Sequence, residues 1–92
     1  MNSVWVFNCA TSGFPAGVFS QRVIAEKWIR ERGLSGTLTE YPVDVGVYDW
    51  AVSNGHFEPK RDDQRSAKFV AQFSSATQEH YHYVLGRMEG GD

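Results

Sequence analysis

Four consecutive apolar residues lie close to the start of the chain, at residues 4–7. All four are β-branched or aromatic, which favours a β-strand. Successive side chains of a strand point to opposite faces, so an uninterrupted apolar run predicts a strand that is covered on both faces. We therefore expect residues 4–7 to form a central strand, with the rest of the chain arranged around it.

A hairpin and a helix are predicted to follow this strand. Residues 11–15, Thr-Ser-Gly-Phe-Pro, are typical of a turn, and residues 16–19 are expected to return as a short antiparallel strand. Apolar residues then recur at spacings of three and four: Ile24, Ala25, Trp28 and Ile29. Ser20 is the expected N-cap, and Gly33 is expected to end the helix in a Schellman motif that brings Leu34 back to Ile29. The sequence thus predicts a helix over residues 21–32.

The second half of the chain is predicted to contain two strands and two helices. Residues 37–41 alternate in polarity as a strand does, Asp44 is expected to cap a short helix that runs to about residue 52, and Asn54-Gly55 is expected to end it. Residues 58–65 are charged and predicted to be an exposed loop.

Of the last two predicted elements, the first has an ambiguous sequence pattern and the second has a clear one. Residues 66–73 match both helical spacing and strand alternation, and we favour a helix capped by Ser66. Residues 79–85 are predicted to form a strand with His80 and His82 on one face and Tyr81 and Tyr83 on the other.

This order of elements predicts an α+β fold. Because there is no regular βαβ alternation, we expect a mostly antiparallel sheet of about four strands, with two or three helices packed on one face. The length of 92 residues fits a single domain. We assign residues 1–85 to this domain and residues 86–92, which contain three glycines, to a flexible C-terminal tail.

Composition excludes several classes of function. The formal net charge is −2, whereas a protein that binds mainly phosphates carries a basic excess, so nucleic acid is not the expected main partner. The apolar run at the amino terminus is too short for a membrane span or a signal peptide. A single cysteine, Cys9, cannot form an internal disulfide. We therefore expect a cytoplasmic protein that does not associate with membranes.

Three histidines and the cysteine are the candidates for chemistry. His80 and His82, two residues apart on a strand, can reach one metal ion, and His56, Cys9 or an aspartate would supply a third ligand. Half-exposed histidines that stack on neighbouring rings explain the same pattern, because this spacing alone is weaker than true zinc-ligand spacing. Cys9 is expected to be a small buried residue and not a nucleophile. We predict no cofactor.

Aromatic and acidic residues indicate a surface for binding another protein. Trp and Tyr are enriched at binding hot spots, and Glu40 lies among the aromatic side chains in the sequence. The predicted partner-binding residues are Tyr41, Asp44, Tyr48, Asp49, Trp50 and Tyr83. They would form an aromatic, acidic face for a basic protein. The alternative is that most of these rings fill the core.

Several segments resemble a family of short, uncharacterised bacterial proteins, a domain of unknown function that spans nearly the whole chain. The segments are 17–19, 25–29, 34–42, 48–51 and 73–83, and the most particular is Gln-Glu-His-Tyr-His-Tyr at residues 78–83. The resemblance covers about residues 4–84 and implies a bacterial or phage source and a stand-alone domain. It implies no catalytic residue.

The sequence therefore favours a small, non-enzymatic protein-binding module, of the kind represented by immunity proteins or phage-derived inhibitors. No set of residues meets the geometric minimum for catalysis. A small metal-binding protein or metal-dependent enzyme that uses His80 and His82 is the alternative. A homodimer formed through the last strand or the second helix is a third hypothesis.

Overall fold

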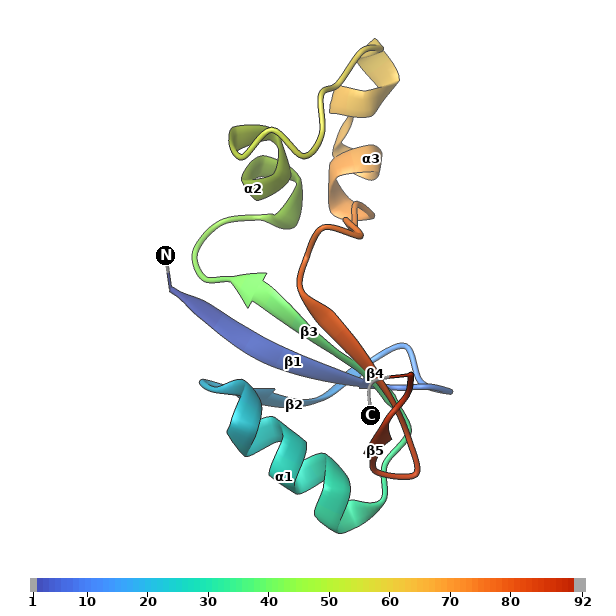
Figure 1. The fold of residues 1–92 in the computed structure, drawn as a ribbon. Helices are drawn as coiled ribbons and strands as arrows, with labels where there is room; N and C mark the ends of the chain where they lie inside the picture. The colour runs from blue at the N-terminus through green and yellow to red at the C-terminus, as the bar shows by residue number, and fades with distance from the viewer. Residues whose placement is uncertain (1, 91–92) are drawn as a thin grey trace.

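The computed structural model describes residues 2–90. These residues form a five-stranded antiparallel sheet in the order β2-β1-β3-β4-β5, together with three α-helices and one 3₁₀ helix (Figure 1). In chain order the elements are β1 (Ser3–Cys9), β2 (Pro15–Phe19), α1 (Arg22–Arg32), β3 (Gly36–Pro42), α2 (Val47–Ser53), η1 (Asp62–Arg65), α3 (Ala67–Ala71), β4 (His80–Val84) and β5 (Arg87–Met88). The α+β class and the antiparallel sheet are confirmed.

The hydrophobic core lies between α1 and one face of the sheet. Its buried residues are Trp5, Phe7, Ala25, Ile29, Leu38 and Tyr83. Phe7 packs edge-on against the Trp28 ring of α1 at 5.8 Å, which joins the helix to β1. Ile24 was predicted on the buried side of this helix, but it is 49% exposed because it points past the edge of the sheet-facing stripe.

The end of α1 follows the prediction. Gly33 adopts φ 63°, its N–H donates to the Arg30 carbonyl, and the Leu34 N–H donates to the Ile29 carbonyl at 3.0 Å. These two bonds define a Schellman motif. At the start of the helix the prediction was wrong: Gln21, not Ser20, is the N-cap, and no side chain caps the first turn.

Close approach of β3 to β1 requires a glycine at the first position of β3. Gly36 is opposite Cys9, and a Cβ at Gly36 would lie 2.1 Å from the carbonyl oxygen of Asn8. Any side chain would therefore push the two strands apart. Since β3 is the middle strand of the sheet, this contact helps to set the position of every element that follows.

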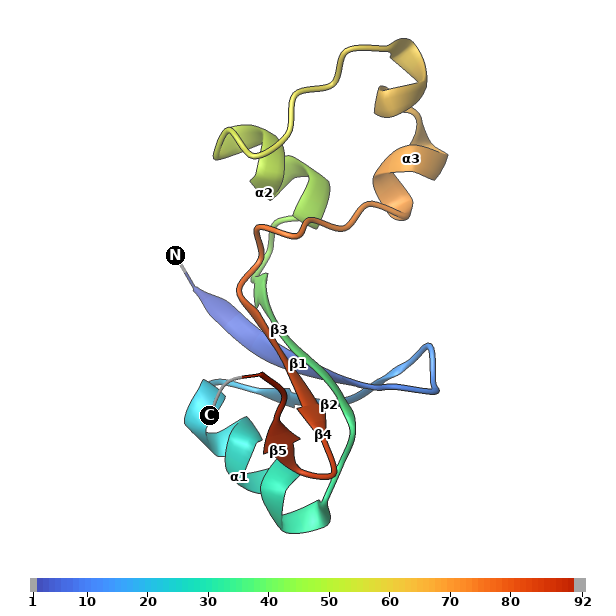
Figure 2. The same ribbon diagram turned by 45° about the vertical axis from the view of Figure 1, so that its right-hand side comes forward.

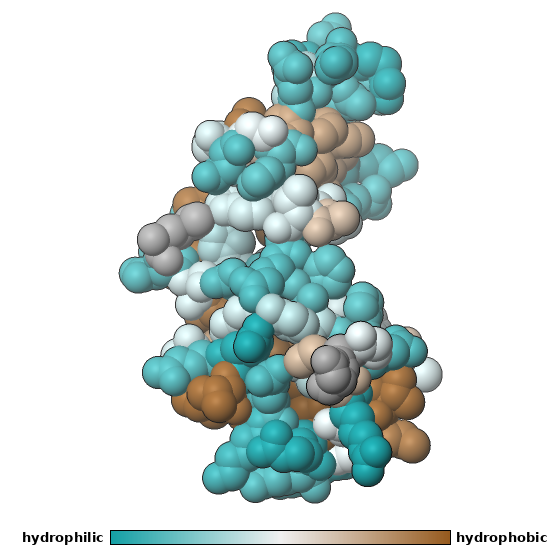
Figure 3. All heavy atoms as spheres, viewed as in Figure 1, coloured by the Kyte–Doolittle hydropathy of each residue, from teal (hydrophilic) through white to brown (hydrophobic). Residues whose placement is uncertain are grey.

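Residues 43–77 form a helical arm that projects beyond the end of the sheet (Figure 2). The arm contains α2, η1 and α3, and it gives the molecule its elongated dimensions of 45 × 27 × 22 Å. Its own small core is aromatic: Tyr48 contacts Phe57, Phe69 and Phe73 at ring distances of 5.4 to 6.2 Å. The tip of the arm, around η1, is hydrophilic (Figure 3).

The arm corrects the prediction that two or three helices pack on one face of the sheet. Of the helices that the structure describes, only α1 covers the sheet, whereas α2 and α3 pack against each other through the aromatic cluster. The physical reason is that α2 and α3 are short, with seven and five residues, and their rings find partners within the arm.

Other local predictions of the second half had mixed outcomes. Residues 66–73 are helical over Ala67–Ala71, and the Ser66 hydroxyl accepts the Phe69 N–H at 3.2 Å as the N-cap. Asp44 is not the cap of α2, because Gly46 holds that position and Asp44 itself adopts φ 68°. The segment predicted as an exposed loop contains η1.

The segment predicted as a tail contributes a strand. Arg87–Met88 pair with β4, and Met88 packs against the core. The turn into β5 is made by Leu85 and Gly86, both at positive φ. Residues 91 and 92 of the predicted tail lie outside the described residues.

The two faces of the sheet have different surroundings. Trp5, Phe7 and Leu38 point towards α1 and are buried, whereas Val4 and Val6 point from the opposite face and are only half-buried. The prediction that residues 4–7 are covered on both faces is therefore wrong for this chain by itself. No described helix lies over the second face.

Candidate functional site

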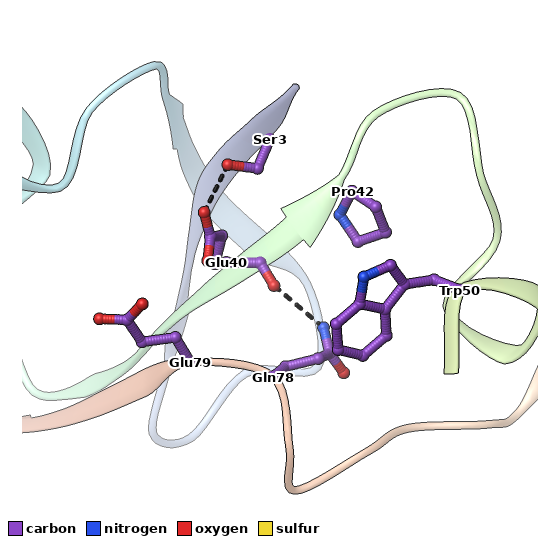
Figure 4. A pocket seen from close by; sticks show the side chains of 6 residues that line it. All are labelled: Ser3, Glu40, Pro42, Trp50, Gln78 and Glu79. Atoms are coloured by element: carbon purple, nitrogen blue, oxygen red, sulfur yellow. Dashed lines mark hydrogen bonds between the residues drawn. The ribbon is translucent and has the colours of Figure 1, made fainter. Parts of the chain in front are cut away.

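A small pocket lies where the arm meets the sheet (Figure 4). Its volume is about 100 Å³, and its walls are Ser3, Glu40, Pro42, Trp50, Gln78 and Glu79. The residues come from β1, β3, α2 and the segment that leads into β4. The pocket therefore exists only because the chain leaves the sheet at Pro42 and returns to it at Gln78.

Gln78 holds the returning segment against β3. Its side chain is 5% exposed, its Nε2 donates to the Glu40 carbonyl at 3.1 Å, and its Oε1 accepts the Ser75 N–H at 3.2 Å. Both ends of the Gln78 amide are therefore hydrogen-bonded, and these bonds connect the returning segment to β3. Gln78 is a positioning residue that sets the floor of the pocket.

Trp50 forms the wall that the arm contributes. It lies on α2, is half-buried, and contacts the His56 ring at a tilt of 41° with the ring centroids 5.1 Å apart. In Figure 4 the indole lies beside Pro42 and Gln78, while the carboxylates of Glu40 and Glu79 lie on the other side of the pocket. One wall is therefore an aromatic face and the other is acidic.

Glu40 and Glu79 have different partners. The Glu40 carboxylate accepts the Ser3 hydroxyl at 2.5 Å and, within residues 2–90, makes no ion pair. Glu79 accepts the Tyr81 hydroxyl and lies 3.5 Å from the Arg22 guanidinium, so its charge is partly balanced. Glu40 is consequently the carboxylate whose charge is available to a ligand.

A network beside the pocket fixes Arg22 and two tyrosines. The Arg22 guanidinium lies 4.6 Å above the Tyr81 ring and 3.8 Å from Glu26, and the Tyr83 hydroxyl donates to Glu26 at 2.6 Å. The hydrogen bond to Glu79 raises the pKa of Tyr81. Burial and the Glu26 carboxylate raise the pKa of Tyr83. Both phenols therefore stay protonated well above neutral pH.

The predicted partner-binding residues are dispersed. Trp50 lines the pocket, and Asp44 and Asp49 are exposed on the arm. Tyr41 points from the opposite face of the sheet.

The two remaining tyrosines of that set, Tyr48 and Tyr83, are buried in the two cores, so their predicted place on a binding surface is wrong. Tyr48 is 9% exposed and lies in the aromatic cluster of the arm, where its hydroxyl donates to the Gln64 carbonyl at 2.8 Å. Tyr83 is 5% exposed in the main core. Their rings are used for packing and present little area to a partner.

Sequence reasoning missed that Glu79 and Glu40 lie side by side on the acidic wall of the pocket. The residues are 39 positions apart, and they become neighbours because the Glu40 N–H donates to the Glu79 carbonyl at 2.9 Å where β4 begins. The signal available in the sequence was Glu40 itself, on a strand that alternates in polarity. The register of β3 against β4, which no local pattern specifies, decided the rest.

The histidines do not converge. The rings of His80 and His82 are 5.3 Å apart on the face of the sheet opposite α1, whereas His56 contacts the Trp50 ring in the arm. The His80 Nδ1 donates to the Gln78 carbonyl at 2.7 Å, and the His82 Nδ1 lies 3.2 Å from the Thr37 hydroxyl. Among residues 2–90, no three His, Cys, Asp or Glu side chains are arranged to hold a metal ion.

Cys9 is half-buried at the end of β1 and contacts Thr11. The Thr11 hydroxyl, 3.5 Å from the thiol sulfur, lowers the pKa of the thiol. The expectation of a buried cysteine at a strand end is therefore met in position but only partly in burial. No base lies in hydrogen-bond contact with Cys9 in the part of the chain that the structure describes.

A family model described as a domain of unknown function, DUF7710, matches residues 4–89. The chain belongs to this family. The match extends through β5, which agrees with the strand found at Arg87–Met88. No curated protein and no solved structure matches the chain. None of the helices formed by residues 2–90 has the length and apolar character needed to cross a membrane.

Proposed function

We propose that this DUF7710 domain is a protein-binding module, and that its pocket accepts a basic side chain of the partner. The observation that carries the proposal is the placement of the Trp50 indole opposite the carboxylates of Glu40 and Glu79. An aromatic face attracts a cation by about 0.5–2 kcal/mol. A carboxylate adds a charge-assisted hydrogen bond. Lys and Arg are the side chains that use both.

The size of the pocket supports a side-chain ligand. A volume of about 100 Å³ equals about three water molecules of liquid. That space suits an ammonium or guanidinium head and is too small for a metabolite or cofactor, whose sites span about 300–1,000 Å³. Affinity would come from the surrounding surface, where exposed Asp44 and Asp49 add negative charge that attracts a basic protein.

An inhibitor or immunity-type role fits this surface. Small acidic proteins of that kind cover a basic patch on a target and need no catalytic group of their own. The net charge of −2 and the elongated arm support such a role, because the arm extends the contact area beyond the sheet. The proposed partner is a basic protein, and the cytoplasm is the proposed location.

The test is a titration followed by NMR with N-acetyl-arginine amide as the probe. We expect the indole N–H signal of Trp50 to shift, with little change at Trp5 and Trp28, because those rings lie in the main core. The citrulline analogue has nearly the same shape without the charge and is the matched ligand control. Equal shifts with both ligands, or none at Trp50, would contradict the proposal.

Substitution of the carboxylate completes the test. Glu40→Gln keeps an oxygen that accepts the Ser3 hydroxyl while removing the charge, so we expect arginine amide to bind several-fold more weakly. Glu58→Gln removes an exposed charge from the arm, away from the pocket, and is the matched protein control. The proposal fails if both variants bind the probe as the unaltered protein does.

A further inference from the structure

Within residues 2–90, no helix covers the face of the sheet opposite α1, residues 74–76 border it at the arm end, and it is almost free of charge. Two rows of cross-strand neighbours point from this face. The first row is Val18, Val6, Thr39 and His80, and the second is Asn8, Thr37 and His82. Val4 and Tyr41 point from the same face nearer the arm, and Val84 does so at the far end of β4. We refer to these residues as the open face. In the described strands no Asp, Glu or Lys points from it, because Glu40, the one acidic residue of these strands, points to the other side.

The open face conflicts with the amino-acid pattern of β1. A strand with one face in water normally alternates apolar and polar residues, whereas Val4 and Val6 are apolar on the water-facing side. Val18 on β2 is paired with Val6 on β1 and is 63% exposed, and Val84 on β4 is 47% exposed. The pattern of β1 is that of a strand whose second face is also covered.

The charge distribution indicates what covers it. Both copies of a homodimer carry the same charges, so a face suited to self-association has to be neutral or self-complementary. The open face meets this condition: in β1 to β4 its polar groups are hydroxyls, one amide and imidazoles, and Arg87 lies at the β5 edge. The acidic pocket on the other side of the sheet would repel its own copy.

We propose that the open face binds a second copy of this chain and forms a weak, reversible dimer through face-to-face packing of the two sheets. Four strands spaced about 4.8 Å apart and about five residues long present roughly 300 Å² per copy. Stable interfaces bury about 1,200 Å² or more in total. The dimer therefore forms at high protein concentration, and the pocket remains accessible in it because the pocket lies on the α1 side.

Two valines of almost equal exposure provide a matched pair of variants. Val18 on the open face is 63% exposed, and Val23 on the outer surface of α1 is 65% exposed. In a symmetric dimer, Val18→Lys places two lysines in the interface, whereas Val23→Lys adds the same charge to a surface outside it. Circular dichroism of each variant verifies that it is folded.

The measurement is sedimentation velocity of the full chain from about 10 μM to about 1 mM, a range that spans weak association. We expect the unaltered protein and Val23→Lys to shift from 10.4 kDa towards twice that mass as concentration rises. Val18→Lys should remain monomeric over the whole range. Should Val18→Lys not fold, Val84→Lys on β4 tests the same face.

Dilution NMR locates the contact. Amide shifts that depend on concentration should be confined to the open face, with Val6 and Thr39 among the largest, and absent at Trp50. A chain that is monomeric at every concentration overturns the proposal and leaves a different protein as the occupant of the face. Equal loss of dimer in Val18→Lys and Val23→Lys, or shifts centred on Trp50, also overturns it.

Discussion

In the sheet half of the molecule Phe7, Ile29 and Leu38 are fully buried, whereas in the arm the buried residues are Tyr48 and Ala51, and Phe57, Phe69 and Phe73 remain partly exposed. The sheet half is held by strand pairing and by a helix laid across it. The arm is held by four aromatic rings and short helices. The arm therefore has much less apolar burial per residue, and we expect it to open locally while the sheet stays folded.

This difference bears on function, because the pocket lies on the boundary. Trp50 belongs to the arm, while Ser3 and Glu40 belong to the sheet. Opening of the arm would take apart the pocket without unfolding the core. A partner that binds both walls would in turn stabilise the arm.

The largest predicted effect comes from the core of the sheet half. Leu38→Ala removes a side chain with no exposed surface, so we expect a loss of about 2–5 kcal/mol in the free energy of unfolding. Urea denaturation followed by circular dichroism measures it. Both halves should unfold at a lower urea concentration, because the arm depends on β3 and β4 for its two ends. Unchanged stability would show that the comparison of the two halves is mistaken.

A smaller and local effect is expected in the arm. Tyr48→Ala removes the ring that contacts Phe57, Phe69 and Phe73, and the loss of this small core should open the arm. Hydrogen exchange should become fast in α2 and α3 and stay slow in β1 and β3. Tyr41→Ala, on the open face, is the control that should leave the arm protected. Loss of protection throughout the chain after Tyr48→Ala would mean that the halves unfold together.

The smallest effect concerns the hydroxyl of Tyr83. Tyr83→Phe removes the hydrogen bond to Glu26 and should lower the free energy of unfolding by about 0.5–1.5 kcal/mol at neutral pH.

The raised pKa of Tyr83 gives this variant a distinct pH dependence. Because the folded pKa lies above the unfolded value of about 10, the stabilisation is complete below about pH 10 and is lost as pH rises further. The unaltered protein should therefore lose more stability above about pH 10 than Tyr83→Phe does. The urea midpoints of both proteins, measured as a function of pH above and below about pH 10, test this expectation. The same pH dependence of the midpoint in both proteins would contradict the raised pKa of Tyr83. Tyr81, whose pKa is also raised, is present in both proteins.

Elements with complete local signals were predicted well. The spacing of Ile24 to Ile29 and the glycine at position 33 specify α1 and its ending, because each signal acts within a few residues. The alternation at residues 79–85 also fixed which histidines share a face. The pocket was predicted only in part, through Trp50 and Glu40, because its remaining walls depend on strand register.

Where the helices lie could not be predicted in the same way. Tyr48, Phe57, Phe69 and Phe73 carry the same apolar pattern whether they pack on the sheet or on each other, so the pattern does not distinguish a covering helix from an arm. The strand at Arg87–Met88 was missed because two residues are too few to show alternation.

The amino-acid sequence by itself determined the α+β class, the hairpin, the first helix and the presence of a strand at residues 4–7, since these depend on short-range preferences and periodicity. Only the tertiary structure decided that one face of the sheet stays open, that the second and third helices form an arm, and that Trp50 faces Glu40 and Glu79. The physical reason is that burial and register are set by contacts between residues far apart in the chain, and each apolar residue has more than one partner that could satisfy it.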